Sequence, residues 1–143
     1  MRIALIADVH GKREAFDAVL AALAREAVER FVLLGDLVGY GADPAYCVER
    51  SAELVEHGAL AVRGNHDAAA LDAGAVEFND YAREAMLWTR GALKDEHRAF
   101  LAALPLTAAD GERLYVHASP AEPAAWRYVG DAAAAQAAFA ATA

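Results

Sequence analysis

The sequence predicts an α/β fold built on a parallel sheet, and two observations support that prediction. Four short apolar runs, at 3–7, 31–34, 60–62 and 114–116, are each bounded by glycine or polar residues. Helical spacing of apolar residues separates the first three runs. Because parallel strands are buried on both faces and are joined by helices, this alternation is typical of a β-α-β-α-β unit.

The first expected helix spans about 12–27 and follows a strand at 3–7. One face of this helix is apolar, with the spacing of residues that pack on a sheet: Phe16, Val19, Leu20, Leu23 and Ala27. A second helix begins at Asp43-Pro44, where aspartate is a favoured N-cap and proline suits the first helical position, and it ends near His57. A strand at 59–62 completes the unit.

Helices are also expected in the second half of the chain, at about 79–90, 95–104 and 132–141. Three large side chains of these helices are expected to pack in the core: Trp88, Phe100 and Leu101. Asp110-Gly111 lies between two strand-like segments and predicts a β-hairpin.

Bulk composition limits the classes of function. A chain of 143 residues has the size of one domain, expected over 1–143, and no apolar run approaches the roughly 18 residues of a membrane span. We therefore expect a cytoplasmic protein with no membrane partner. The net charge of −8 opposes binding to nucleic acid. Cys47 is the only cysteine, which excludes an internal disulfide, and its place in an expected helix predicts a buried thiol.

Polar residues follow each apolar run directly. They include Asp8, His10, Asp36, Asn65, His66 and His117. Ligands of open α/β sheets bind at the carboxyl ends of the strands, so these side chains are expected to converge on one site. Carboxylates, imidazoles and an amide form a mixed oxygen and nitrogen donor set for a metal. An ordinary nucleotide-binding domain matches less well, because the first strand lacks a glycine-rich phosphate loop.

The motifs, in this order, resemble those of the calcineurin-like metallophosphoesterase family. The matching stretches lie between Met1 and about Pro120, and they are Asp8-Val9-His10, Gly35-Asp36-Leu37-Val38-Gly39, Gly64-Asn65-His66-Asp67 and His117. The family's protein-phosphatase branch continues its second motif with Val-Asp-Arg-Gly, whereas Val38 is followed here by Gly39-Tyr40-Gly41. The chain looks more like the small bacterial phosphodiesterase-like branch.

The resemblance implies a β-sandwich flanked by helices, in αββα layers, with two divalent metal ions at one edge. By the family pattern, Asp8 and His10 bind the first metal, Asn65 and His117 the second, and Asp36 bridges both. Manganese, iron, zinc, nickel and cobalt all suit these donors. The implied activity is hydrolysis of a small phosphorylated substrate by a metal-activated water, as a phosphodiesterase or a phosphatase.

The resemblance also assigns residues to the substrate. His66 would protonate the leaving oxygen, on a loop that turns sharply at Gly64, and Asp67 would orient the His66 ring. Arg63 would either contact a phosphate oxygen or form a surface ion pair. His97 matches no motif and is expected at the surface.

The family's fifth motif, Gly-His-x-His, is absent, because no histidine follows His117. We therefore expect a domain truncated at its C-terminus, with three protein ligands for each metal when Asp36 is counted twice. An uncovered sheet edge would favour self-association into homo-oligomers. The alternative function is a non-catalytic metal-binding or protein-binding scaffold of the same fold, although the presence of His66 favours an enzyme.

Overall fold

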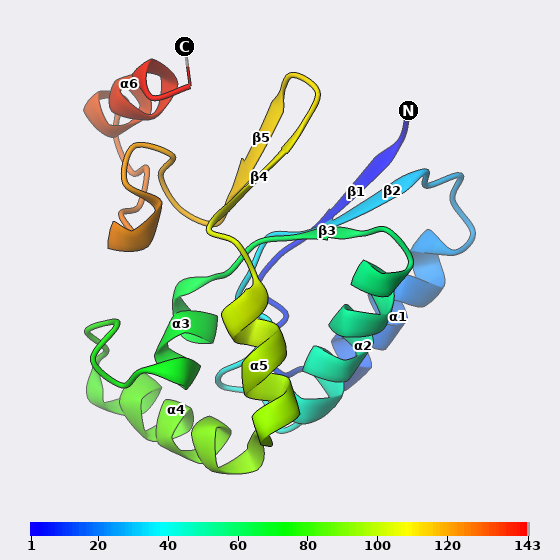
Figure 1. The fold of residues 1–143 in the computed structure, drawn as a ribbon, viewed down its shortest axis with the longest axis vertical. Helices are drawn as coiled ribbons and strands as arrows, with labels where there is room; N and C mark the ends of the chain where they lie inside the picture. The colour runs from blue at the N-terminus through cyan, green and yellow to red at the C-terminus, as the bar shows by residue number, and fades with distance from the viewer. Residues whose placement is uncertain (143) are drawn as a thin grey trace.

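A computed structural model describes residues 1–142 and shows helices packed on two small sheets (Figure 1). In chain order the elements are β1 (Ile3–Ile6), α1 (Arg13–Leu23), β2 (Arg30–Leu33), α2 (Pro44–Glu56), β3 (Leu60–Ala61), α3 (Asn65–Leu71), α4 (Asp80–Ala92), α5 (Asp95–Ala103), β4 (Thr107–Asp110), β5 (Arg113–Val116), the 3-10 helix η1 (Pro123–Ala125) and α6 (Ala132–Ala140). The predicted α/β class is confirmed.

The first three strands form a parallel sheet in the order β1-β2-β3. Ile3 lies opposite Arg30, and Leu33 lies opposite Ala61. Helices α1 and α2 connect these strands, as the β-α-β-α-β pattern predicts. Strands β4 and β5 form the expected antiparallel hairpin, in which Asp110 pairs with Arg113 across the turn.

The two faces of the parallel sheet are covered by different layers. Side chains of Ile6, Leu33 and Ala61 join the main core, to which the helices contribute residues such as Phe16 and Leu101. On the opposite face, Val32 and Val62 pack against Tyr115 and Ala108 of the hairpin. The resulting order of layers is helices, parallel sheet and hairpin (Figure 1). Because β1, β2 and β3 run parallel, their carboxyl ends lie at one edge of the sheet.

Two helices differ from the sequence prediction in their extent. Helix α1 ends at Leu23, and the segment up to Ala27 forms turns, so only Phe16 and Leu20 of the expected stripe are fully buried. Helix α3 begins directly at Asn65, where a loop was expected. Gly64 is its N-cap, and a run of alanines follows the motif, which favours helix once the chain has turned.

Trp88 of α4 was expected in the core but lies at the surface. Trp88 is 53% exposed, whereas Ala82, Met86 and Thr89 are buried. The face of α4 that packs on the core therefore contains Met86 and Thr89 rather than Trp88. Leu101 is fully buried and Phe100 partly buried, as expected.

His97 is also placed differently from the expectation, since it is only 2% exposed. Its Nε2 lies 3.0 Å from Oε1 of Glu49 on α2, and its Nδ1 accepts the backbone N–H of Lys94 at 3.2 Å. The side chain therefore caps the first turn of α5 and connects this helix to α2. Nothing in the sequence around His97 indicated this, because Glu49 is 48 residues away.

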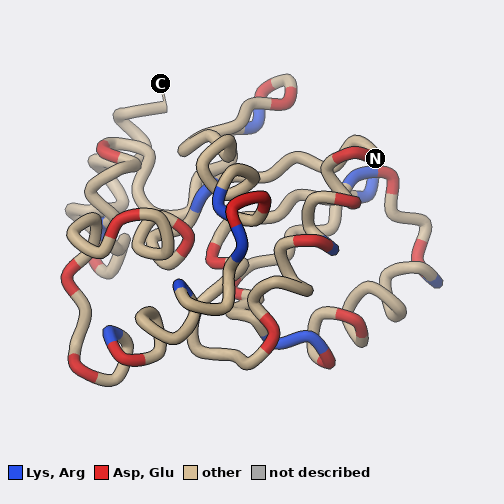
Figure 2. The backbone as a smooth tube through the Cα atoms, turned by 60° about the horizontal axis from the view of Figure 1, so that its bottom comes forward, with Lys and Arg blue, Asp and Glu red and all other residues tan. Residues whose placement is uncertain are grey.

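Charge is distributed over the whole surface. Asp and Glu, 21 in the sequence against 13 Lys and Arg, occur on most elements and loops (Figure 2). Among the described residues, no helix has the length and apolar character needed to cross a membrane.

Candidate metal centre

The predicted ligands lie on loops whose backbone is unusual. Asp8, His10 and Asp36 have φ values of 56°, 51° and 54°, in the left-handed region that side chains other than glycine rarely adopt. Backbone hydrogen bonds join the two loops: His10 N donates to Asp36 O at 2.9 Å, and Gly11 N donates to Leu37 O at 2.9 Å. The strained turns are held in place by each other and bring the side chains to one edge of the sheet.

Two groups of donor atoms converge there. One contains His10, Asp36 and His66, and the other contains Asp8, Asp36 and His117; within each group the donor atoms all lie within 4.8 Å of one another. Asp36 belongs to both groups and is only 4% exposed. Its Oδ2 lies 3.7 Å from Nε2 of His10 and 3.5 Å from Nε2 of His117, so the carboxylate stands between two imidazoles.

The orientation of both imidazoles fits metal ligation. Nδ1 of His10 lies 3.1 Å from the carbonyl oxygen of Val38, and Nδ1 of His117 lies 2.7 Å from that of Leu34. A carbonyl oxygen only accepts, so Nδ1 carries the hydrogen in each ring and Nε2 of the neutral ring presents a lone pair to the site. A backbone carbonyl on the outer nitrogen is the arrangement that orients histidine ligands in metalloproteins.

Asn65 adds a further acceptor. Its Oδ1 lies 2.9 Å from Nε2 of His117, and Oδ2 of Asp36 is 3.5 Å from the same nitrogen. These three atoms are donors that one divalent cation could share. The donor set and its geometry fit the metals that accept mixed oxygen and nitrogen ligands.

Electrostatics at Asp36 support the same conclusion. Burial, and next the neighbouring Asp67 carboxyl, raise the pKa of Asp36 to about 7. The negative form is therefore disfavoured without a counter-charge. A bound cation would supply that charge and restore the carboxylate.

Asp67 does not orient His66. Its carboxylate accepts four backbone N–H groups, from Asp36, Leu37 and Gly64 at 2.9 Å each and from Val38 at 3.3 Å. Adjacent residues of a helix point in different directions, so Asp67 turns toward the loop after β2 while His66 turns toward the site. The carboxylate is fully buried, and burial raises the pKa of Asp67 against the opposing effect of the four amides. Its role is to hold the loop that carries Asp36.

His66 is buried among aromatic rings. Its centroid lies 4.6 Å from that of His10, 4.7 Å from that of Tyr40 and 4.6 Å from that of Phe78. A Cβ atom at Gly39 would lie 2.5 Å from Nδ1 of His66, and Gly39 has a φ of +94°, so only glycine allows this approach. Burial, and next the proximity of His10, lower the pKa of His66 to about 4, and the metal-free ring is neutral at pH 7.

Arg63 forms no surface ion pair among the described residues and instead binds backbone carbonyls of α5. Its guanidinium donates to the carbonyl oxygens of Leu101 at 3.1 Å and Leu104 at 2.8 Å, and also to that of Ala102. These carbonyls lie at the C-terminal end of α5, where a cation is favoured. Arg63 thereby fixes α5 next to the strand end that precedes Gly64.

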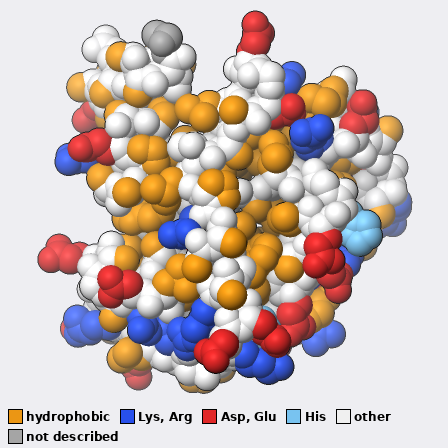
Figure 3. Space-filling view, viewed as in Figure 1, with side chains coloured by type: hydrophobic (Ala, Val, Ile, Leu, Met, Phe, Trp, Pro, Cys, Tyr) orange, Lys and Arg blue, Asp and Glu red, His pale blue; other side chains and the backbone are white. Residues whose placement is uncertain are grey.

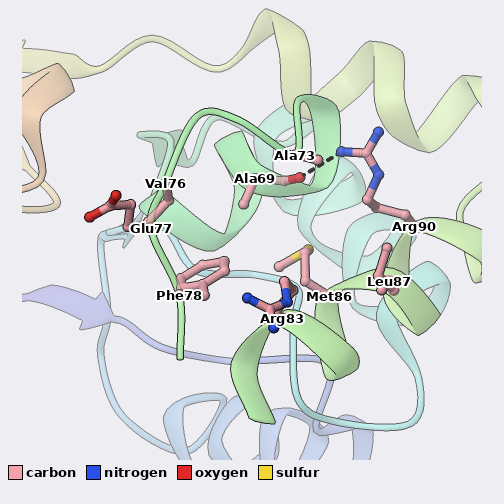
Figure 4. Close-up of a pocket in the computed structure, with 9 residues that line it drawn as sticks. All are labelled: Ala69, Ala73, Val76, Glu77, Phe78, Arg83, Met86, Leu87 and Arg90. Atoms are coloured by element: carbon pink, nitrogen blue, oxygen red, sulfur yellow. Dashed lines mark hydrogen bonds between the residues drawn. The ribbon is translucent and has the colours of Figure 1, made fainter. Parts of the chain in front are cut away.

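Two cavities of about 600 Å³ each share the segment Val76–Phe78 in their walls. One opens beside Asn65 and His66. The other is lined by α3 and α4 (Figure 4), where Arg90 donates to the carbonyl oxygen of Ala69 at 3.0 Å. Tyr40 and Phe78, which line the first cavity, were not singled out from the sequence, although the Gly39-Tyr40-Gly41 turn could have indicated a side chain held beside the site.

Comparison with known proteins shows the family to which the chain belongs. The model of the calcineurin-like phosphoesterase family matches residues 1–130. An uncharacterized protein of Methanocaldococcus jannaschii is 38% identical over 132 residues, which are 89% of this chain and 53% of that protein. A metallophosphoesterase from Sphaerobacter thermophilus has a crystal structure that is 40% identical, with a TM-score of 0.83, over 99% of this chain and 56% of that one.

A hypothetical protein of Pyrococcus horikoshii OT3, at 23% identity and a TM-score of 0.75, shares the fold over 90% of this chain and 57% of its own. The chain thus spans about half the length of these relatives. Since the family model covers most of the sequence, the chain belongs to the calcineurin-like phosphoesterase family.

Proposed function

We propose that this protein hydrolyses a phosphoester at a dinuclear metal site built around Asp36. The observation that carries the proposal is the position of the Asp36 carboxylate between Nε2 of His10 and Nε2 of His117, at 3.7 and 3.5 Å. A carboxylate oxygen has lone pairs for two cations, and paired cations are typical of hydrolases that act on phosphorus.

In this proposal Asp8 and His10 hold one cation, Asn65 and His117 hold the other, and Asp36 is shared. When bound, the cations would lower the pKa of a coordinated water and neutralise charge on the phosphoryl group. The proposed dinuclear arrangement leaves coordination positions for water and for the substrate.

Of the remaining residues, one transfers a proton to the substrate and two hold parts of the site in place. We assign to His66 the delivery of a proton to the leaving oxygen, because its ring lies against His10 and lines the adjacent cavity. Negative charge on a bound phosphoryl group would favour the protonated ring that this role requires. Asp67 holds the Asp36 loop through four amides, and we assign Arg63 a structural role at the end of α5 rather than a contact with substrate.

Metal analysis and turnover test this proposal together. The unaltered chain should take up manganese at millimolar concentrations and hydrolyse bis(p-nitrophenyl) phosphate only when manganese is present. Asp36→Asn should lower occupancy of both sites, and Asn65→Ala should mainly lower that of one. Asp72→Asn is the matched control, since Asp72 is an exposed carboxylate at the end of α3 and should leave both quantities unchanged.

The outcomes separate the proposal from its alternative. Metal uptake by the unaltered chain without hydrolysis of any phosphoester would favour a non-catalytic metal-binding scaffold of the same fold. No uptake at millimolar manganese would show that the ligand assignment is wrong.

A further inference from the structure

An aromatic cavity adjoins the candidate metal centre. Its volume is about 600 Å³, and Asn65 and His66 form the wall that it shares with the site. Four aromatic side chains from three separate parts of the chain line it: Tyr40, Phe78, Trp126 and Tyr128. This volume is in the range of cavities that bind a small organic molecule.

Two of these aromatic residues are held in backbone conformations that bulky side chains rarely adopt. Tyr40 has a φ of 61° and lies between two glycines, and Trp126 has a φ of 54° directly after η1. Such conformations cost free energy and persist where the surrounding structure enforces them, often at ligand sites. Both rings lie beside histidines of the candidate site. The ring centroid of Tyr40 is 4.7 Å from that of His66, and the ring centroid of Trp126 is 6.1 Å from that of His117.

The aromatic rings remain accessible to a ligand. Tyr40 is 51% exposed and Tyr128 is 89% exposed, although a tyrosine usually buries most of its ring. Exposed aromatic faces beside a cavity are platforms on which a planar group can stack.

Charge and hydrogen-bonding groups narrow the ligand further. No lysine or arginine is among the described residues that line the cavity, and Glu77 is the only acidic one. The lining therefore offers no cationic side chain of lysine or arginine to a phosphate chain, whereas a neutral planar group needs none. Oδ1 of Asn79 accepts the N–H of Ala82 at 3.0 Å, which leaves the amide nitrogen as a donor, and Glu77 is an acceptor. A heteroaromatic ring with both donors and acceptors matches these groups better than a phenyl ring.

We propose that this cavity binds the nucleobase of the substrate while the phosphoryl group lies at the metal centre. The inference rests on the proposed function and narrows its substrate to a nucleoside phosphoester. Stacking of one base on aromatic side chains contributes about 1–3 kcal/mol, which predicts roughly a tenfold gain in affinity over a ligand without the base.

Calorimetry on the manganese-loaded protein tests the preference with three phosphate monoesters. Adenosine 5′-monophosphate should bind at least about tenfold more tightly than ribose 5-phosphate and phenyl phosphate. Trp126→Ala and Tyr128→Ala should each reduce that ratio several-fold. Trp88→Ala and Tyr81→Ala are the matched controls, because they remove the same residue types from exposed positions on α4 and should leave the ratio unchanged.

A second measurement needs neither metal nor turnover. The sequence has two tryptophans, so Trp88→Phe leaves Trp126 as the only one, and adenosine should quench its fluorescence whereas ribose should not.

Equal affinity for adenosine 5′-monophosphate and ribose 5-phosphate would overturn the aromatic cavity as a ligand site. Equal affinity for phenyl phosphate would overturn the nucleobase assignment. Quenching by adenosine in a protein that takes up no manganese would overturn the proposed function and leave the preference for a base in place.

Discussion

His66 and Asp67 are adjacent in the sequence but contribute to the site in different ways. The His66 ring faces the candidate metal centre and the aromatic cavity, whereas the Asp67 carboxylate is fully buried against backbone amides. Both residues belong to one family motif, Gly64-Asn65-His66-Asp67. In the structure only His66 is placed to meet a substrate, and Asp67 determines where Asp36 lies.

Replacement of His66 should separate chemistry from metal binding. His66→Asn should leave manganese content nearly unchanged and lower turnover roughly a hundredfold, the usual magnitude for loss of a general acid. The loss should be smallest for aryl phosphodiesters with good leaving groups, because these need little protonation. His57→Asn, at an exposed histidine, is the control. An equal loss on activated and unactivated esters would argue against the acid role.

Replacement of Asp67 should lower the free energy of unfolding. Asp67→Ala leaves four buried N–H groups without their acceptor, and each such group costs about 1–3 kcal/mol, so a loss of about 3 kcal/mol or more is expected. Asp67→Asn keeps one acceptor oxygen and should lose less. Urea denaturation measures both, with Asp72→Ala as a control that should change stability by less than about 0.5 kcal/mol. Equal stability of all three variants would contradict the role assigned to Asp67.

Cys47 should be chemically inert in the folded protein. Burial, and next the carboxylate of Asp43, raise the pKa of its thiol to about 12 from 9.0. The reactive thiolate is therefore about a thousandfold scarcer below pH 9 than in an exposed cysteine, and its fraction grows only as the pH approaches 12. Iodoacetamide labelling followed by mass spectrometry should give full modification in urea and little at pH 8 without it. Rapid labelling of the native protein at pH 8 would show that the thiol is accessible.

At the scale of elements, the helices depend on contacts with distant segments. α5 begins at Asp95, and His97 in its first turn accepts the N–H of Lys94 and lies against Glu49 of α2. At the C-terminal end of α5, backbone carbonyls accept from Arg63, which follows β3. Each end of this short helix is therefore in contact with a side chain from a distant segment, Glu49 at one end and Arg63 at the other. Short helices have little stability of their own and obtain it from such packing.

The two partners of the α2–α5 contact should differ in their effect on stability. His97→Ala removes a buried ring and both of its hydrogen bonds, and it should lower the free energy of unfolding by about 2–3 kcal/mol. The side chain of Glu49 is 55% exposed, so Glu49→Ala should cost less than about 1 kcal/mol. Thermal or urea denaturation of both variants provides the comparison. A larger loss for Glu49→Ala would mean that the ion pair, rather than the buried ring, stabilises the contact.

At the scale of the whole molecule, the hairpin covers only part of the parallel sheet. Leu5 of β1 is 58% exposed, and Leu114 on the outer side of β5 is 43% exposed. Figure 3 shows apolar side chains at the surface beside the notch between α6 and the hairpin. β1 is also an edge strand, with an unpaired side that can template pairing with another chain. The main core runs from β1 to α5, and a single domain over 1–143 stays a prediction.

The exposed leucines and the open edge of β1 should cause the protein to self-associate. The unaltered chain should show concentration-dependent dimers or larger species in sedimentation velocity, and Leu5→Ser combined with Leu114→Ser should reduce them. Leu87→Ser is the control, since Leu87 is 61% exposed on α4, away from the sheet. A monomer at all concentrations, or an equal effect of the control, would show that this face does not mediate association.

The sequence by itself determined the strands, the hairpin turn and the chemical identity of the candidate ligands. These depend on local patterns: apolar runs, caps, and polar residues placed where each strand ends. The predicted α/β class and family membership agree with the structure and the comparisons. Local chemistry was sufficient because strand ends of a parallel sheet meet at one edge whatever the details of packing.

Only the tertiary structure decided which side chain meets which. Asp67 contacts amides 31 residues earlier, Arg63 reaches carbonyls 38 residues later, and His117 meets Asn65 across 52 residues. The same holds for the buried face of α4 and for the aromatic cavity, whose walls come from four separated segments. Partners of this kind follow from the packing of whole layers against one another, and no spacing along a single chain specifies them.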